Sequence, residues 1–381
     1  MIQKKLYYVK KNVIIIAYRR CEVMKKLRKK TRRRLTIFII VGILIIASGV
    51  TVLFLNRKGG DTPNIGSTED NDNSQVETPI KKVQVIDLES KSRPYAVMIN
   101  NNSAVWKYQS GMNEAYIVYE MLVEGGITRE MALYKDATTA KIQSVRSSRH
   151  YFLDYALEND AIYVHWGWSP QAQSDISSLK INNINGLTYE GSYFFRDSTV
   201  KAAYEHRGYT TMEKLKSAAE RLKYRTTTDA KSLLAYSAEP IDMASMDGVV
   251  DAKYVEISYS GGYSAKFYYD EETKEYKRSQ NNTELIDFTS KERITTHNII
   301  VYNVGYKTMD SYGRQNMTNI GSGTGYYISE GKAIPIKWEK KSRSGKTIYM
   351  LPNGEELSVN DGRTYIGLQP TGRTVKINAT A

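Results

Sequence analysis

Residues 141–180 have the sequence KIQSVRSSRHYFLDYALENDAIYVHWGWSPQAQSDISSLK, and this stretch decides the fold class. It alternates strand-like and helix-like patterns, because segments 141–146 and 160–166 are each followed by a run that carries a helix start signal. In the second run, Ser169 and Pro170 form the favoured pair of helix cap and first-turn residue. Two strands joined by a helix run parallel, with a right-handed crossover. The stretch therefore predicts a βαβ unit.

The same alternation extends over residues 83–225, which we interpret as an α/β domain. Beyond about residue 245 the pattern changes to short, tyrosine-rich alternating runs separated by glycine and asparagine turns. Residues 248–378 are therefore predicted to form a mainly antiparallel, all-β domain, and residues 226–247 a connector. The expected fold class is α/β or α+β.

The positive charge of the chain is confined to its beginning. The whole chain has a net charge of +13, and residues 1–34 contain fourteen Lys/Arg and one acid, which also gives 14 − 1 = +13. The remainder has 40 basic and 40 acidic residues, so the body of the protein is neutral. A neutral body lacks the basic surface that binds phosphate backbones, and no nucleic-acid partner is expected.

Residues 35–55, LTIFIIVGILIIASGVTVLFL, contain no charge and are long enough, at about 31 Å, to cross one bilayer as a helix. The basic segment before them predicts a cytoplasmic N-terminus and an extracytoplasmic body at the cell membrane. The alternative is a cleaved signal peptide, although signal cores are typically only about 7 to 15 residues long. Residues 1–23 could be a misassigned start, and residues 56–82 have the composition of a disordered linker.

Cysteine and histidine are too scarce to support a metal or redox site. The single cysteine, Cys21, precedes the predicted span, and there are only four histidines. The body is therefore expected to have no disulfide and no cysteine-based metal site. We predict no metal and no cofactor.

The ends of the two predicted parallel strands form the candidate site, because ligands of open α/β sheets bind at that edge. Arginines and free helix N–H groups favour an anion, and a tryptophan can stack on it. An alternative is that Trp166 and Trp168 cap a hydrophobic core while His165 donates to a carbonyl. The predicted ligand-binding residues are Arg146, Ser147, Arg149, His165, Trp168 and Ser169.

Two weaker groups of ionisable residues are secondary candidates. Three glutamates would share one face if residues 114–124 were a single strand, and one of them could pair with Arg129. A second group lies in a loop-like stretch, where solvated loop residues are the alternative. These secondary candidates are Glu114, Glu120, Glu124, Arg129, Arg196, Asp197 and His206.

Five runs resemble the YerB-like family of bacterial cell-envelope lipoproteins: RPYAVMINN, QSGMNEAYIVYEMLVEGGITREMALY, VRSSRHYFLDYALENDAIYVHWGWSP, FFRD and GYYISEGKAIPIKWEKKSRS. The resemblance covers roughly residues 83–375 and implies a two-part domain of unknown function at the surface of a bacterium. It transfers no residue role. The chain departs from the family in having no cysteine after the apolar segment and in the two tryptophans of HWGWSP.

Three functions are open at this stage. The leading hypothesis is an extracytoplasmic protein that binds an anionic envelope component, such as a cell-wall polymer, at the strand ends. One alternative is an envelope hydrolase that uses a carboxylate and a histidine as acid and base. Another is a scaffold that recruits a second envelope protein. Whether the protein is an enzyme is left undecided.

Overall fold

The computed structural model describes residues 81–380, and residues 78–381 group into one compact unit. The predicted basic segment 1–34, the apolar span 35–55 and nearly all of the linker 56–82 lie outside the described residues. None of the helices found in the described part has both the length and the apolar character needed to cross a bilayer.

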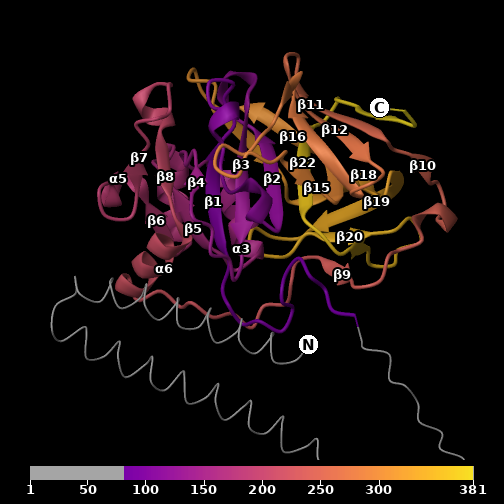
Figure 1. Cartoon of the computed structure of the whole chain (residues 1–381), viewed down its shortest axis with the longest axis horizontal. Helices are drawn as coiled ribbons and strands as arrows, with labels where there is room; N and C mark the ends of the chain where they lie inside the picture. Colours follow the sequence, from indigo (N-terminus) through magenta and orange to yellow (C-terminus); the bar gives the residue numbers. More distant parts are fainter. Residues whose placement is uncertain (1–80, 381) are drawn as a thin grey trace, which may run out of the picture. The chain divides into compact units, whose positions relative to one another are not determined.

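A twelve-stranded mixed sheet runs through the molecule and contains strands from both predicted domains (Figure 1). The order across it places strands from the C-terminal half beside strands from the N-terminal half, with β2 as the partner of β22. In spatial order the strands are β10 (Val250–Asp251), β19 (Lys332–Lys340), β18 (Gly321–Ser329), β16 (Asn298–Thr308), β22 (Thr364–Pro370), β2 (Ile117–Leu122), β3 (Thr128–Tyr134), β1 (Tyr95–Asn100), β5 (Ile162–His165) and β6 (Asn183–Asn185), with β17 (Gln315–Thr318) beside β16 and β20 (Ile348–Met350) beside β19.

A βαβ unit is present, but one of its strands differs from the prediction. Strands β5 and β6 are parallel and are joined through helix α4 (Pro170–Ser178). The predicted strand 141–146 is reduced to β4 (Ile142–Gln143), which pairs antiparallel in a separate sheet with β8 (Gly208–Thr210). β5 pairs with Tyr95–Val97 of β1, so only the end of β1 is left for this segment, which meets it in a single antiparallel bridge between Ile99 and Val145.

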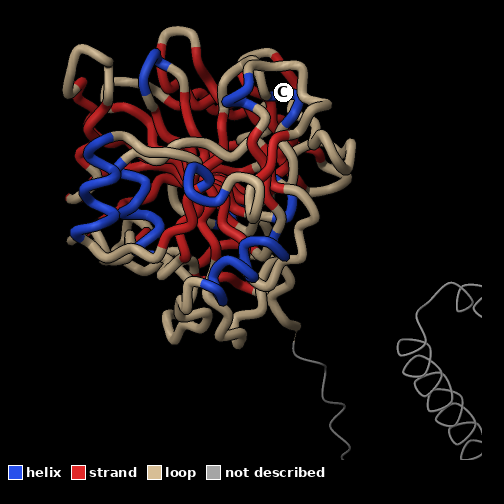
Figure 2. Tube along the Cα trace, turned by 90° about the vertical axis from the view of Figure 1, so that its left-hand side faces the viewer, coloured by secondary structure: helices blue, strands red, loops and turns tan. Residues whose placement is uncertain are grey.

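Helices lie on both faces of the N-terminal half of the large sheet (Figure 2). Tyr151, Phe152 and Tyr155 of α3 (His150–Glu158) pack in one core with residues of β1 and β5. On the other face, Leu215 and Ala219 of α6 (Met212–Arg221) pack with different residues of the same strands. Burial on two faces explains why the residues of β5 are apolar almost without interruption.

A six-stranded antiparallel sheet covers the C-terminal half of the large sheet. Val255 and Phe267 on this second sheet pack against Ile299 and Val301 of β16, which forms a third core. This arrangement confirms the predicted mixed α/β sheet followed by an antiparallel β-sheet. The six strands are β14 (Thr283–Glu284), β13 (Glu275–Gln280), β12 (Tyr263–Asp270), β11 (Tyr254–Ser260), β23 (Val375–Asn378) and β15 (Thr295–Thr296).

Short elements complete the fold. A three-stranded sheet joins β4 and β8 to β7, and two further strands pair in parallel. The remaining elements are β7 (Phe195–Arg196), β9 (Ala235–Ser237), β21 (Ser358–Asn360), α5 (Gly186–Tyr189) and the 3-10 helices η1 (Trp106–Tyr108), η2 (Met112–Glu114), η3 (Glu124–Gly126), η4 (Tyr204–His206) and η5 (Met243–Ser245).

Candidate functional site

The two segments that follow β4 and β5 run side by side. The Trp166 N–H donates to the Arg146 carbonyl at 2.9 Å, and the Ser148 N–H donates to the Gly167 carbonyl at 2.9 Å. Ser148 and Trp168 form a parallel β-bridge. Although segment 141–146 is not a strand of the large sheet, these backbone bonds bring together the two groups of residues that the sequence places at one edge.

An open pocket with a volume of about 360 Å³ lies beside these segments. Trp166 in its wall is only 6 % exposed, and its indole N–H has no hydrogen-bond partner within residues 81–380. A buried donor without a partner costs free energy, but this nitrogen has almost no exposed surface and is not placed to bond a ligand in the pocket. The pocket is lined by Arg146, Ser147, Trp166, Gly167, Trp168, Leu187, Arg196 and Glu205.

Arg146 is the cation of the pocket that lacks a carboxylate partner. Its guanidinium donates to the Glu205 backbone carbonyl at 3.1 Å. In the described part of the chain it has no carboxylate oxygen within 4 Å. Burial lowers the pKa of Arg146, the charge of Glu205 opposes this, and Arg149 adds to the lowering. Keeping the Arg146 guanidinium charged in this partly buried position therefore costs free energy, and a bound anion would lower that cost.

Arg196, a secondary candidate, forms part of the pocket wall but is already neutralised. Its guanidinium makes two hydrogen bonds to the Glu190 carboxylate, at 2.9 and 3.3 Å. The same group lies 3.9 Å from the ring centre of Trp166 and 4.3 Å from that of Tyr204. Stacking and ion pairing fix Arg196 between the two rings, so it shapes the wall more than it supplies free charge.

Arg149 and Arg129 lie outside the pocket lining. Arg149 pairs with Glu124 through two hydrogen bonds, of which the Nη2–Oε2 bond measures 2.9 Å. Arg129 is 7 % exposed and donates to the Ser147 carbonyl at 2.7 Å. Burial lowers the pKa of Arg129 to about 9, with Arg149 as the next cause. The predicted pairing of Arg129 with a neighbouring glutamate is therefore wrong, because Glu124 binds Arg149 instead.

His165 and Ser169 serve the fold and do not line the pocket. The His165 ring is fully buried between Tyr163 and Trp168. Its Nδ1 lies 2.8 Å from the Gly167 carbonyl and its Nε2 lies 3.1 Å from Asn183 Oδ1. Burial lowers the pKa of His165 to about 4, so the ring is neutral at pH 7 and its Nδ1 donates to the carbonyl.

Ser169 is the N-cap of α4. Its hydroxyl accepts a hydrogen bond from the Ala172 N–H at 3.3 Å, and the side chain is buried. This confirms the helix start that the Ser-Pro pair predicts. The Ser169 hydroxyl therefore serves as the helix cap. Ser147 does line the pocket, and its hydroxyl donates to the Trp166 carbonyl at 2.9 Å.

The three glutamates do not share one strand face, which corrects the sequence-based expectation. Only Glu120 lies in β2, whereas Glu114 ends η2 and Glu124 begins η3. Glu120 is fully buried and accepts hydrogen bonds from Tyr365 at 2.8 Å and from Arg278 at 2.5 Å. Glu114 and Glu124 lie in 3-10 turns before and after β2, so the strand is shorter than expected and the carboxylates are separated.

Asp197 and His206 also fall outside the pocket lining. Asp197 forms an ion pair with Lys141 and accepts from the Thr199 hydroxyl at 2.6 Å. The Nδ1 of His206 lies 2.8 Å from the Asn100 side-chain nitrogen. Both residues hold neighbouring loops together.

Leu187 and Glu205 complete the pocket wall, and neither was predicted as a site residue. Leu187 lies on α5 and is 62 % exposed, and Glu205 lies on η4. Both elements reach the pocket through loops whose path depends on long-range packing. The one sequence signal for Glu205 is that it directly precedes His206, a secondary candidate, and Leu187 has none.

Two family models match the chain, at residues 83–225 and 255–366. They are described as the N-terminal and C-terminal domains of a protein of unknown function, DUF3048. The chain belongs to the DUF3048 family. It is 28 % identical over 301 residues to the Bacillus subtilis (strain 168) protein named "Putative lipoprotein YerB". The aligned region covers 78 % of this chain and 87 % of that protein.

A solved structure extends this relationship to the fold. The crystal structure of the YerB protein from Bacillus subtilis superposes with a TM-score of 0.67 at 27 % identity, and the match covers 76 % of this chain and 94 % of that one. The predicted resemblance to the YerB-like family is confirmed. The family descriptions assign no activity, so the function has to be inferred from the pocket itself.

Proposed function

We propose that this protein is held at the cell membrane and binds an anionic component of the cell envelope in the pocket lined by Arg146, Trp166 and Trp168. Residues 35–55 would provide the membrane anchor, and the name of the Bacillus subtilis relative as a lipoprotein supports an envelope location. The ligand would be a cell-wall polymer or a fragment of one.

The observation that carries the proposal is the half-buried Arg146 guanidinium without a carboxylate partner within residues 81–380. Charged groups in such positions are normally paired. The Arg146 guanidinium in the pocket wall can pair with an anionic group, and a charge-assisted bond to arginine is stronger than a neutral one.

The charge of the pocket limits the kind of anion. Arg196 is matched by Glu190, and Glu205 contributes a negative charge to the lining. One free guanidinium favours a ligand unit with a single carboxylate or phosphate over a densely charged polyanion, which would need several phosphate contacts. The aromatic rings beside it suit a ligand with a flat or apolar face.

The hydrolase alternative lacks a matching constellation. No two of its suggested acids and bases hydrogen-bond to each other within the described residues, and Glu120, Asp197, His165 and His206 bond to other groups. Glu114, the fifth, ends a 3-10 helix and does not line the pocket.

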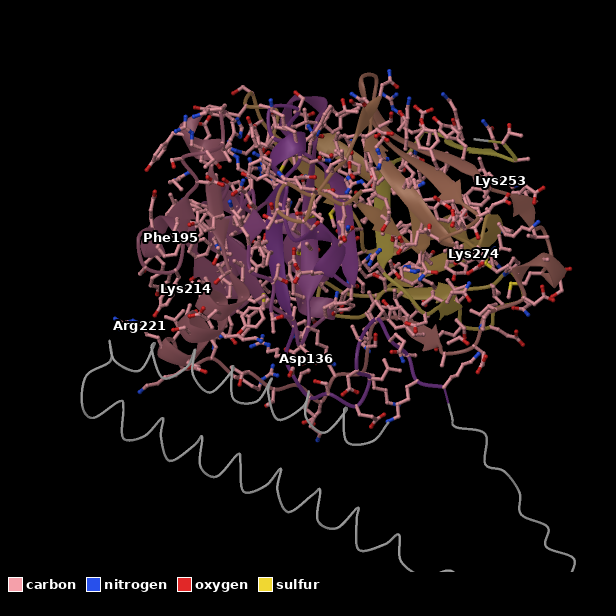
Figure 3. The ribbon with its side chains drawn as sticks, viewed as in Figure 1. Asp136, Phe195, Lys214, Arg221, Lys253 and Lys274 are labelled. Carbon is pink, nitrogen blue, oxygen red and sulfur yellow. The ribbon has the colours of Figure 1, made fainter. Side chains whose placement is uncertain are left out.

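Binding of a soluble cell-wall digest to the full-length chain tests the proposal. Changing Arg146→Gln should weaken binding at least about tenfold, because it removes the charge that pairs with the ligand. Arg221→Gln is the matched control, since Arg221 is an exposed arginine at the end of α6 that does not line the pocket (Figure 3). Equal retention of the digest by both variants, or no retention by the unmodified chain, would contradict the proposal.

A further inference from the structure

A second pocket, with a volume of about 390 Å³, opens between α3, α4 and the β16–β17 hairpin. Its wall is mostly polar and has apolar patches from Tyr151, Met309, Met317 and Ile320. The hydrogen-bonding side chains in the wall are His150, Asp154, Gln171, Asp175, Asn316, Asn319 and Arg343. Nothing in the first pocket or its proposed role uses these residues.

Two buried carboxylates dominate this second pocket. Arg343 bridges Asp154 and Asp175, with contacts of 2.6 and 2.7 Å. Asn319 donates to the other Asp154 oxygen at 3.0 Å, and Gln171 donates to the other Asp175 oxygen at 2.6 Å. Each carboxylate oxygen thus accepts one bond from the described residues and has capacity for a second.

The two pockets have different electrostatic character. Two carboxylates and one guanidinium leave the second pocket with one excess negative charge when Asp154 and Asp175 are both ionised. The first pocket offers the unpaired guanidinium of Arg146. An anionic group is therefore favoured in the first pocket and disfavoured in the second, where hydroxyl or amino donors fit the free acceptor positions.

The pockets are neighbours along two stretches of the chain. In the first stretch, Ser147 lines the first pocket and His150 lines the second. In the other stretch, Trp168 lines the first pocket and Gln171 lines the second. Each pair is three positions apart, so their Cα atoms are separated by at most about 11 Å even for a fully extended chain. The backbone segments between them are themselves hydrogen-bonded, through the Ser169 N–H and the Ser148 carbonyl at 3.2 Å. The lining residues of the two pockets thus lie within the length of a ligand a few units long.

We propose that the two pockets are adjoining subsites for one acidic oligosaccharide: the first takes the unit that carries the acidic group, and the second takes a neutral or amino-substituted sugar unit. This inference rests on the proposed function of the first pocket. A polymer with a phosphate on every unit would place an anion beside Asp154 and Asp175, which would repel it. A peptide offers fewer hydroxyl donors than a sugar for the free acceptor positions of Asp154 and Asp175.

The test compares three named sugars on the full-length chain by titration calorimetry. The acidic disaccharide is N-acetylglucosaminyl-N-acetylmuramic acid, its uncharged counterpart is diacetylchitobiose, and the acidic single unit is N-acetylmuramic acid. The double variant Gln171→Ala/Asn316→Ala removes two exposed polar groups from the second pocket and leaves the Arg343 bridge in place. Gln173→Ala, an exposed glutamine on the same helix, is its matched control.

The double variant should bind the acidic disaccharide about tenfold more weakly than the control and should bind the single unit equally well. Arg146→Gln should weaken binding of both acidic sugars, and diacetylchitobiose should bind more weakly than the acidic disaccharide. Loss of disaccharide binding in Arg146→Gln but not in the double variant would overturn the second subsite and leave the first intact. If none of the three sugars binds, and a peptide or glycerol phosphate fraction is retained through Arg146, the carbohydrate assignment is overturned and the proposed function of the first pocket still stands.

Discussion

Arg146 and His165 are both candidate residues at the ends of predicted strands, but only Arg146 lines the pocket. Arg146 faces the pocket, whereas the His165 ring is enclosed by aromatic neighbours and its Nδ1 donates to the Gly167 carbonyl. The sequence places both at strand ends, but it cannot show which way His165 points, because all four residues of β5 are buried. Alternation identifies the inward face only when the other face is exposed to water.

A prediction about acid stability follows from the burial of His165. Burial lowers its pKa to about 4, so between pH 6.5 and 4 the unfolded chain binds a proton that the folded chain does not. The free energy of unfolding should therefore fall as the pH is lowered through this window, by up to about 3 kcal/mol from this residue. Urea unfolding at a series of pH values, compared between the unmodified chain and His165→Gln, measures it. Parallel pH profiles for the two proteins would show that His165 is not the cause.

At the scale of elements, helix start signals predicted α4 well and α6 less well. Ser169 caps α4 as the Ser-Pro pair indicates. For α6, the spacing of Thr210 and Glu213 is typical of a capping box, but Thr211 is the residue whose side chain accepts from the Lys214 N–H. Thr210 ends β8 and donates its hydroxyl to the Tyr193 carbonyl at 2.8 Å. A tertiary contact thus takes the hydroxyl that local sequence assigns to the helix.

The cap of α4 gives a prediction of its own. Ser169→Ala leaves the first-turn N–H groups without their side-chain acceptor and should lower the free energy of unfolding by about 1 kcal/mol. Ser169→Asp keeps an acceptor at the helix start and should lose less. Thermal and urea unfolding of the two variants make the comparison. An equal loss in both would mean that the buried position of Ser169, and not its capping bond, determines the effect.

At the scale of the whole molecule, the large sheet joins strands that are far apart in the sequence. Glu120 on β2 and Tyr365 on β22 are 245 positions apart and share a hydrogen bond of 2.8 Å. The composition change near residue 245 falls between the two family models but gives no sign that their strands join in one sheet through the β2–β22 pair. Patterns within a short window identify strands, whereas the partner of each strand depends on packing across the entire chain.

Arg278 from the C-terminal half is enclosed between Glu120 and Glu130 of the N-terminal half, and all three are nearly or fully buried. Arg278→Met should lower the free energy of unfolding by about 3–5 kcal/mol, because it leaves two buried carboxylates without their partner. Lys253→Met is the control, since the Lys253–Glu271 pair lies on the surface (Figure 3) and should contribute little. Adding Glu120→Gln and Glu130→Gln to Arg278→Met should recover part of the loss. No recovery would mean that packing, and not the unpaired charge, dominates.

The most direct test of the central claim uses the tryptophans of the pocket as reporters. Two of the four tryptophans of the chain, Trp166 and Trp168, line the pocket beside Arg146. Titrating the full-length chain with an acidic cell-wall fragment should change its tryptophan fluorescence in a saturable manner, and Arg146→Gln should shift the midpoint at least about tenfold to higher concentration. A fluorescence change with the same midpoint in both proteins, or no change in the unmodified chain, would contradict the claim that this pocket binds an envelope anion through Arg146.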